Sequence, residues 1–311
     1  MNHTGTANSS ILMDFILLGL AGLPVHPPFL FALFLITYML TLLGNMIIIL
    51  AVWVDSRLQT PMYYLLANFS FVDMSMASVT VPKMLADLLS LRKTISVSCC
   101  FVQMYFFLFV GNTESFLLAG MAYDRYIAIC FPLHYTTVMT RRVCFALVTF
   151  SWAVSSLHSL LHTLMTTRLS FCGSSIITHF FCDLPTLLKM SCSDTSVNDT
   201  VLFIEASLLI MSPLACVLLS YIQIVLAILK IRTAHGRWRT FSTCASHLAV
   251  VSLFYGAGMC TFLQPSSTRS LYSNRLVSLM YTALTPMLNP FIYSLRNKEI
   301  KLALKRVLAS H

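Results

Sequence analysis

Four acidic side chains interrupt the apolar stretches of this chain, in which only 10% of residues are charged. Asp73, Glu114 and Glu205 stand alone in such stretches, whereas Asp124 is followed directly by Arg125 in the run "ESFLLAGMAYDRYIAIC". Charge is costly in an apolar environment and tends to mark function. Isolated carboxylates can share a proton or bind a cation, and an acid–arginine pair can rearrange when a helix moves. An acid–base enzyme is disfavoured, because no nucleophile or water path accompanies these acids.

The composition indicates the environment in which these charges must be positioned. Hydrophobic residues make up 57% of the 311 residues, and the mean hydropathy is +0.79. A water-soluble domain of this size does not need so much apolar surface, so a polytopic membrane protein is predicted. The net charge of +9 does not indicate a nucleic-acid partner, because the basic residues lie in short connections between apolar runs, without interleaved aromatics.

Seven stretches are long enough to cross a bilayer as helices, which requires about 20 residues each. They predict an all-α fold, a seven-transmembrane helix bundle, with spans at 28–53, 61–85, 98–126, 143–164, 201–229, 241–263 and 276–295. The organisation is then an extracellular tail at 1–27, the bundle at 28–295 and a cytoplasmic segment at 296–311. That last segment places Ile300, Leu304, Val307 and Leu308 on one helical face beside basic residues, which predicts a short amphipathic helix on the membrane surface.

Basic residues predict the orientation of the bundle. Of the 20 lysines and arginines, thirteen fall on the side of the C-terminus and seven on the other, so the N-terminus is expected outside and the C-terminus in the cytoplasm. The glycosylation sequons at Asn2, Asn8 and Asn198 fall on the outer side and agree with this orientation, whereas the sequon at Asn68 lies within a span. Residues 1–28 lack the basic start of a cleavable signal peptide, so the first span is expected to be an uncleaved anchor.

Half of the ten cysteines are expected on the outer, oxidising side, where disulfides form. Cys99 and Cys100 open the third span, and Cys172, Cys182 and Cys192 lie in the loop between the fourth and fifth spans. Five is an odd number, so at least one thiol stays free, and the residues alone do not give the pairing.

Six fragments, each at its own span, carry a resemblance to a known family. They are "GN" at Gly44, "PMYYLLANFSFVDM" from Pro61, "MAYDRYIAIC" followed by "PLHY", "SY" at Ser220, "FSTCASHL" from Phe241 and "PMLNPFIYSLRN" from Pro286. In this order they resemble the odorant (olfactory) receptors, which are rhodopsin-like class A G-protein-coupled receptors. "PLHY" and the loop lengths are similar to the tetrapod-type class II. Gln59, Arg239 and Thr240 depart from the family's pattern and bear on coupling efficiency.

The resemblance also implies a disulfide pairing. The fragment "CFVQ" marks Cys100 as the cysteine that pairs with the middle loop cysteine, Cys182. Cys172 and Cys192 are implied as a second pair, which leaves Cys99 as a free thiol.

The resemblance further implies an activation switch near the cytoplasmic ends of the helices. Arg125 would be held at rest by Asp124 and freed to face a G protein when the sixth span moves outward. The other members implied are Tyr126, Tyr221, Asn289, Pro290 and Tyr293, with the proline permitting a kink. For His247, a satisfied core histidine and a switch role remain open alternatives.

The resemblance favours a sodium ion at Asp73 and Glu114, with Ser75 or Ser115 as helpers, and implies no other cofactor. Glu114 lies ten residues before Asp124, about 15 Å along a helix, which places it near the middle of the membrane. The charges of this one span therefore divide by depth into an internal polar site and a switch.

A ligand pocket is expected between the outer halves of the third, fifth, sixth and seventh spans, mostly apolar with a few polar anchors. Its candidate residues by helical spacing are Leu108, Gly111, Asn112, Glu205, Leu209, Tyr255, Gly258, Met259, Phe262 and Thr282. Helix packing is the simpler explanation for any single apolar member. Glu205 either faces the pocket or pairs with His158 or His162 of the fourth span.

The resemblance thus implies an odorant receptor of the plasma membrane and not an enzyme. The partners that it implies are a small, mostly apolar and volatile odorant and a stimulatory-type heterotrimeric G protein that raises cAMP, and the apolar spans add the lipid bilayer. A proton- or solute-coupled transporter that uses Asp73, Glu114 and Glu205 as a relay is the alternative, although the sequence shows no internal repeat of the kind common in transporters.

Overall fold

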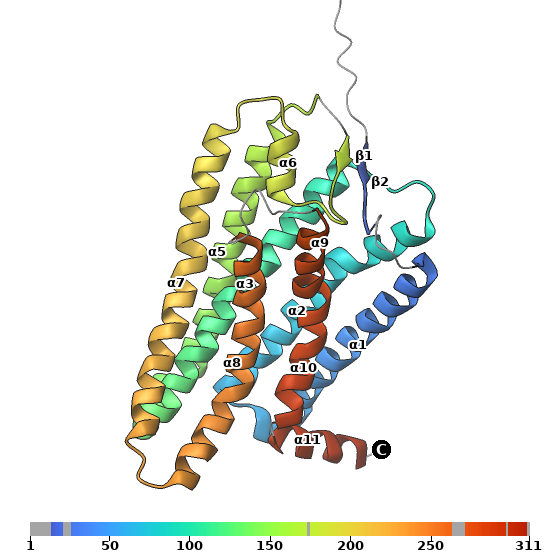
Figure 1. The fold of residues 1–311 in the computed structure, drawn as a ribbon. Helices are drawn as coiled ribbons and strands as arrows, with labels where there is room; N and C mark the ends of the chain where they lie inside the picture. Colours follow the sequence, from blue (N-terminus) through green and yellow to red (C-terminus); the bar gives the residue numbers. More distant parts are fainter. Residues whose placement is uncertain (1–13, 21–25, 173–174, 263–270, 297, 310–311) are drawn as a thin grey trace, which may run out of the picture.

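The computed structural model describes residues 14–20, 26–172, 175–262, 271–296 and 298–309, which form a bundle of long helices (Figure 1). The long helices are α1 (Pro27–Val54), α2 (Pro61–Leu89), α3 (Val97–Cys130), α5 (Arg141–Thr167), α7 (Ser196–Leu229) and α8 (Ala234–Phe262). A seventh segment consists of α9 (Leu271–Leu279), the π-helical turn η3 (Met280–Leu284) and α10 (Thr285–Arg296). The predicted seven-helix bundle is confirmed.

Short elements connect and cover these helices. They are the 3₁₀ turns η1 (Ser56–Leu58) and η2 (Pro132–His134), the helices α4 (Tyr135–Val138) and α6 (Leu184–Met190), and the strands β1 (Asp14–Leu17), β2 (Thr94–Ser96) and β3 (Ile176–Ile177). The last helix, α11 (Lys298–Ala309), lies across the end of the bundle opposite the strands (Figure 1). We refer to the two ends of the bundle as the sheet end and the α11 end.

The helices begin where local chemistry favours a helix start. Prolines occupy the first helical positions of α1 and α2, where the missing N–H costs nothing. Ser96 accepts a hydrogen bond from the Cys99 amide to cap α3, and Thr140 accepts one from the Val143 amide to cap α5. Several helices run beyond the predicted spans; α7 starts at Ser196 rather than Val201, because its polar first turn extends the helix past the apolar run.

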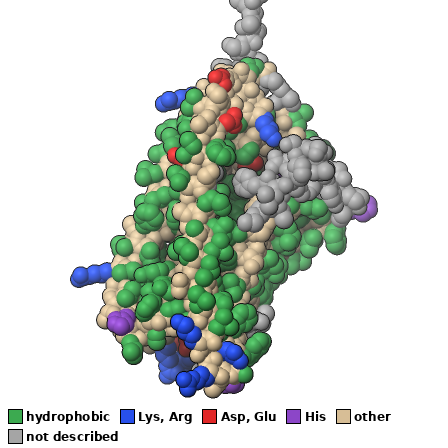
Figure 2. Space-filling model, turned by 60° about the vertical axis from the view of Figure 1, so that its left-hand side comes forward, with side chains coloured by type: hydrophobic (Ala, Val, Ile, Leu, Met, Phe, Trp, Pro, Cys, Tyr) green, Lys and Arg blue, Asp and Glu red, His purple; other side chains and the backbone are tan. Residues whose placement is uncertain are grey.

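Within the described residues, five helices are long and apolar enough to cross a membrane: α1, α2, α3, α5 and α7. Their outward faces carry large apolar side chains, such as Phe203 with 75% and Leu208 with 63% of its surface exposed. Figure 2 shows hydrophobic side chains over the length of the bundle and a gathering of lysines and arginines at the α11 end. Such a surface suits lipid rather than water.

Part of the predicted N-terminal tail forms a strand. In the sheet order β2-β1-β3, β1 pairs antiparallel with β2 through Phe15 and Ile95, and parallel with β3 through Ile16 and Ile176. Phe15 and Leu17 point inward and are fully buried. Residues 14–17 therefore belong to the folded structure and pack over the sheet end.

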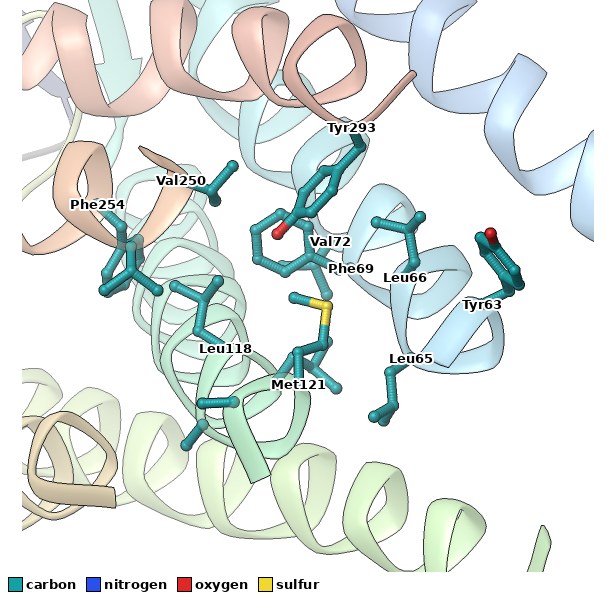
Figure 3. Close-up of a cluster of buried hydrophobic side chains, with 14 of the residues drawn as sticks. Tyr63, Leu65, Leu66, Phe69, Val72, Leu118, Met121, Val250, Phe254 and Tyr293 are labelled. Carbon is teal, nitrogen blue, oxygen red and sulfur yellow. The ribbon is translucent and has the colours of Figure 1, made fainter. Parts of the chain in front are cut away.

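A buried apolar cluster holds α2, α3, α8 and α10 together (Figure 3). The ring of Tyr293 packs edge-on against Phe69 with centroids 6.2 Å apart, and Met121 and Leu118 of α3 point toward the same centre. The labelled members are Tyr63, Leu65, Leu66, Phe69, Val72, Leu118, Met121, Val250, Phe254 and Tyr293. Packing in this cluster fixes how the four helices are aligned along the bundle, and so fixes the level at which their polar side chains lie.

We expect Gly44→Val to destabilise the bundle, because a Cβ at Gly44 would lie 2.9 Å from Cγ of Pro290. Overpacking of this kind costs about 1–3 kcal/mol and would lower the thermal unfolding midpoint in detergent. Gly256→Ala is the matched control, since a Cβ at Gly256 meets no described atom within 4 Å. Equal midpoints for the two variants would contradict the close approach of α1 and α10.

Candidate functional site

Asp124 and Arg125 each bond to a partner other than the neighbouring member of the pair. The buried carboxylate of Asp124 accepts a hydrogen bond from the Tyr135 hydroxyl at 2.8 Å. Arg125 donates from Nη1 to the backbone carbonyl of Thr243 on α8 at 2.5 Å. The ion pairs among the described residues do not include Asp124 with Arg125, and the hydrogen bond of the arginine goes to α8.

His247 joins three helices at the next level toward the sheet end. Its Nδ1 lies 2.8 Å from the Tyr221 hydroxyl of α7, and its Nε2 lies 3.1 Å from the backbone carbonyl of Leu118 on α3. A neutral ring satisfies both contacts, with Nε2–H donating to the carbonyl and Nδ1 accepting from the tyrosine. His247 is thus a fully buried, hydrogen-bonded link between α3, α7 and α8.

A cavity of about 310 Å³ opens at the α11 end beside these contacts. It is lined by Thr60, Met62, Tyr63, Asp124, Arg125, Ala128, Ile129, Tyr135, Thr243 and Glu299. The predicted switch residue Tyr293 lies deeper, with a buried hydroxyl that has no hydrogen-bond partner among the described residues, and Tyr126 packs edge-on against Phe131. Asp124, Arg125, Tyr126, Tyr221 and His247 therefore lie toward the α11 end, whereas the predicted switch residue Asn289 bonds Asp73 further inside the bundle and Pro290 lies against Gly44 of α1.

Asp73 and Glu114 are both buried in the interior of the bundle. Asn289 donates from Nδ2 to both carboxylate oxygens of Asp73, at 3.0 and 3.1 Å. Neither oxygen of Glu114 has a hydrogen-bond partner in the described part of the chain. Two carboxylates, one of them unsatisfied, are a donor set that suits a hard cation such as sodium.

The predicted helpers of that site point elsewhere. Ser75 is half-buried and donates to the Phe71 carbonyl of its own helix. The hydroxyl of Ser115 hydrogen-bonds that of Tyr255 on α8, at 2.8 Å. A cation at Asp73 and Glu114 would therefore be held by the carboxylates without these serines.

The predicted pocket residues on α3 and the seventh segment make local contacts. Asn112 donates to the Leu108 carbonyl one turn back, and the buried Thr282 donates to the Ser278 carbonyl. A Cβ at Gly111 would lie 2.8 Å from the Tyr281 hydroxyl, so the glycine admits that tyrosine.

The predicted pocket residues on α8 differ in what surrounds them. Tyr255 is buried, whereas a Cβ at Gly258 meets no described atom within 4 Å. The side chains of Met259 and Phe262 lie outside the described part of the structure.

Glu205 lies against the fourth span rather than alone in a pocket. Its Oε2 is 2.8 Å from Nδ1 of His158 and 3.1 Å from Nε2 of His162. The glutamate side chain is 28% exposed, and Leu209, one turn further along α7, is half-buried.

The loop between α5 and α7 covers the sheet end. Disulfides join Cys100 to Cys182 and Cys172 to Cys192, while Cys99 is free and exposed; the predicted pairing is confirmed. His179 in this loop hydrogen-bonds Ser278 at 3.0 Å, and burial, with the nearby charge of Arg275, lowers the pKa of His179 to about 3. The imidazole is therefore neutral at physiological pH and anchors the loop to α9.

Of the three predicted glycosylation sites, the structure describes one. Asn198 is only 7% exposed within the first turn of α7, which argues against a glycan at this position. Asn2 and Asn8 lie outside the described residues.

A family model described as olfactory receptor matches residues 34–311. The chain belongs to the olfactory receptor family. "Olfactory receptor 1E16" of Mus musculus is 52% identical over 300 residues, and "Olfactory receptor 1" of Rattus norvegicus is 51% identical over 300; each alignment covers 96% of both chains. Squid rhodopsin has a similar fold, with a TM-score of 0.72 at 19% identity over 92% of this chain and 87% of that one. This multi-pass membrane receptor is therefore not an enzyme.

The olfactory receptor also has aromatic residues in the half of the bundle toward the sheet end that were not among the predicted pocket residues. Tyr281 lies edge-on to Phe107 at 6.2 Å and to Phe254 at 5.5 Å, and Phe107 lies 4.6 Å from Phe181 of the covering loop. Tyr281 lies in the π-helical turn η3, next to the predicted Thr282. The aromatic content of the third span was a signal that could have indicated Phe107.

Proposed function

We propose that this olfactory receptor binds a small, mostly apolar odorant among the outer halves of α3, α7, α8 and the seventh segment. Binding then activates a stimulatory-type heterotrimeric G protein and raises cAMP. The observation that carries this proposal is a series of three polar contacts that hold α8 against α3. They are Ser115 with Tyr255, Leu118 with His247, and Arg125 with Thr243.

These contacts connect the expected pocket to the expected output. Tyr255 lies eight residues from His247 and twelve from Thr243, which is about 12 and 18 Å along one helix. A ligand that replaces the Ser115–Tyr255 contact weakens the attachment of α8 at its outer level. A helix is stiff over this length, so the lower contacts are weakened with it and the population shifts toward a state in which Arg125 is free.

The cavity at the α11 end supports the output role of Arg125. When α8 moves away, the arginine that now donates to Thr243 faces this cavity together with Asp124 and Tyr135. The guanidinium can then donate to backbone carbonyls at the end of a partner helix, where the helix dipole is negative. A G-protein segment that enters as a helix C-terminus has this chemistry.

The proposal includes an orientation with the sheet end outside the cell. The two disulfides at that end suit an oxidising compartment, and the basic residues gather at the α11 end. It also includes a sodium ion at Asp73 and Glu114, which would neutralise the unsatisfied carboxylate of Glu114 at rest.

A chemically diverse odorant panel applied to cells that express the chain tests the proposed function. We expect at least one odorant to raise cAMP in a dose-dependent manner, and no rise in matched cells that lack the stimulatory G protein. Odorant responses that persist without the G protein, or solute flux in proteoliposomes that contain the chain alone, would contradict it.

We expect Tyr255→Phe to raise basal cAMP, because it removes the uppermost of the three α3–α8 contacts. A hydrogen bond contributes about 1 kcal/mol, which corresponds to a shift of about fivefold in the resting equilibrium. Tyr38→Phe is the matched control, since Tyr38 makes a similar bond to Ser78 between α1 and α2. Basal cAMP is normalised to receptor at the cell surface; equal values in the two variants would contradict the role of Tyr255.

A further inference from the structure

Three side chains that commonly bind metals face one another between α5 and α7. His158 and His162 project from α5, and Glu205 projects from α7. One nitrogen of each ring and one carboxylate oxygen lie within 4.8 Å of one another. The cluster lies toward the sheet end, on a different pair of helices from the α3–α8 contacts.

The spacing and chemistry of the cluster suit zinc. Histidines four residues apart project from the same face of a helix one turn apart, an arrangement found in helical zinc sites. Two imidazoles with one glutamate form a three-ligand set that leaves the fourth position of a tetrahedral Zn²⁺ to water. Ligand atoms about 2.1 Å from zinc are about 3.4 Å from each other. The carboxylate oxygen, at 2.8 and 3.1 Å from the two nitrogens, would move slightly outward, and the two ring nitrogens, which lie within 4.8 Å of each other, would approach by at most about 1.4 Å.

Two buried polar atoms on this face of α5 have no hydrogen-bond partner among the described residues. The first is Nε2 of His162, which lies close to Glu205 but out of alignment for a hydrogen bond, in a side chain that is 1% exposed. The second is the hydroxyl of Ser155, seven residues before His162 and so on the same helical face. Unsatisfied buried polar atoms are unusual, and a metal ion with its water would satisfy a set of this kind.

We propose that His158, His162 and Glu205 form a zinc-binding site that links α5 to α7. The glutamate is 28% exposed, while the two histidines are shielded at 7% and 1%. Metal binding here is separate from the proposed signalling function, because it needs neither an odorant nor a G protein.

Titration of the purified, chelator-treated receptor in lipid nanodiscs with Zn²⁺ tests the site, with Co²⁺ as the spectroscopic probe. We expect one tight site per chain and the visible absorption of tetrahedral Co²⁺. Glu205→Gln and His162→Ala should each weaken binding by more than about tenfold. Glu205→His, which supplies a third imidazole, should keep the site. His235→Ala is the control, because His235 is an exposed histidine on α8.

Circular dichroism and gel filtration identify variants that fail to fold. If His162→Ala or Glu205→His fails to fold, the test rests on Glu205→Gln, in which the side chain keeps nearly the same shape as in the parent. The absence of a tetrahedral Co²⁺ spectrum in the parent chain would overturn the proposal. So would equal binding by the parent and a folded Glu205→Gln, a folded Glu205→His without metal, or a loss of binding in His235→Ala.

Discussion

Replacing Cys182 by serine should remove nearly all folded receptor from the cell surface. The disulfide to Cys100 spans 82 residues and joins the start of α3 to the covering loop. Both sulfurs are fully buried in a cluster with Phe15, Leu17 and Leu187. Loss of such a crosslink costs about 2–5 kcal/mol, a large part of the stability of a domain.

Cys99→Ser is the matched control for this prediction, because Cys99 neighbours Cys100 on α3 but is exposed and free. We expect its surface level and thermal unfolding midpoint to equal those of the parent chain. Surface levels are measured with an antibody to an N-terminal tag on intact cells. A Cys182→Ser chain that reaches the surface at the parent level would contradict the structural role of the loop.

Arg125→Ala should abolish the odorant-evoked cAMP response while the receptor still reaches the surface. The side chain is partly exposed, so its loss leaves the apolar core intact. The substitution frees α8 from the resting bond to Thr243, but it also removes the charged donor that lines the cavity and would bond the G protein. A hydrogen bond from a charged group contributes about 1.5–3 kcal/mol, so a loss of more than about tenfold in potency or maximum is expected.

Arg141→Ala provides the comparison, because Arg141 is an exposed arginine at the start of α5, near the same end of the bundle. Its removal changes the net charge by the same amount without touching the α3–α8 contacts. Dose–response curves at matched surface level measure both variants. A normal curve for Arg125→Ala, or an equal loss in Arg141→Ala, would show that the arginine is not the output group.

The bundle was predictable from sequence because an apolar run long enough to span a bilayer must satisfy its backbone hydrogen bonds within itself, and the α-helix is the structure that does so. The strand at Asp14–Leu17 was not, since four residues become a strand only against partners near positions 95 and 176. Their pairing depends on where the loop between α5 and α7 folds. A run of this length carries no periodic signal of its own.

Some features of the candidate site could likewise be predicted from the sequence, and others could not. The depths of Glu114 and Arg125 followed from helical rise, but their partners did not. Arg125 bonds a backbone carbonyl of α8, and a backbone acceptor cannot be predicted from the pattern of side chains in the sequence. Glu205 had two open alternatives that depended on the rotation of α7 against α5, and the structure places it against His158 and His162.

The central claim is that α8 is held to α3 at rest and released when an odorant binds. Spin labels at Arg237→Cys on α8 and Arg141→Cys on α5 report this movement through their distance distribution in nanodiscs, in a background in which the free, accessible Cys99, Cys130 and Cys216 are replaced by serine. With an odorant that raises cAMP in cells, we predict a new population at longer distance, which Tyr255→Phe should show in part without odorant. An unchanged distribution on addition of that odorant at a saturating concentration would contradict the account.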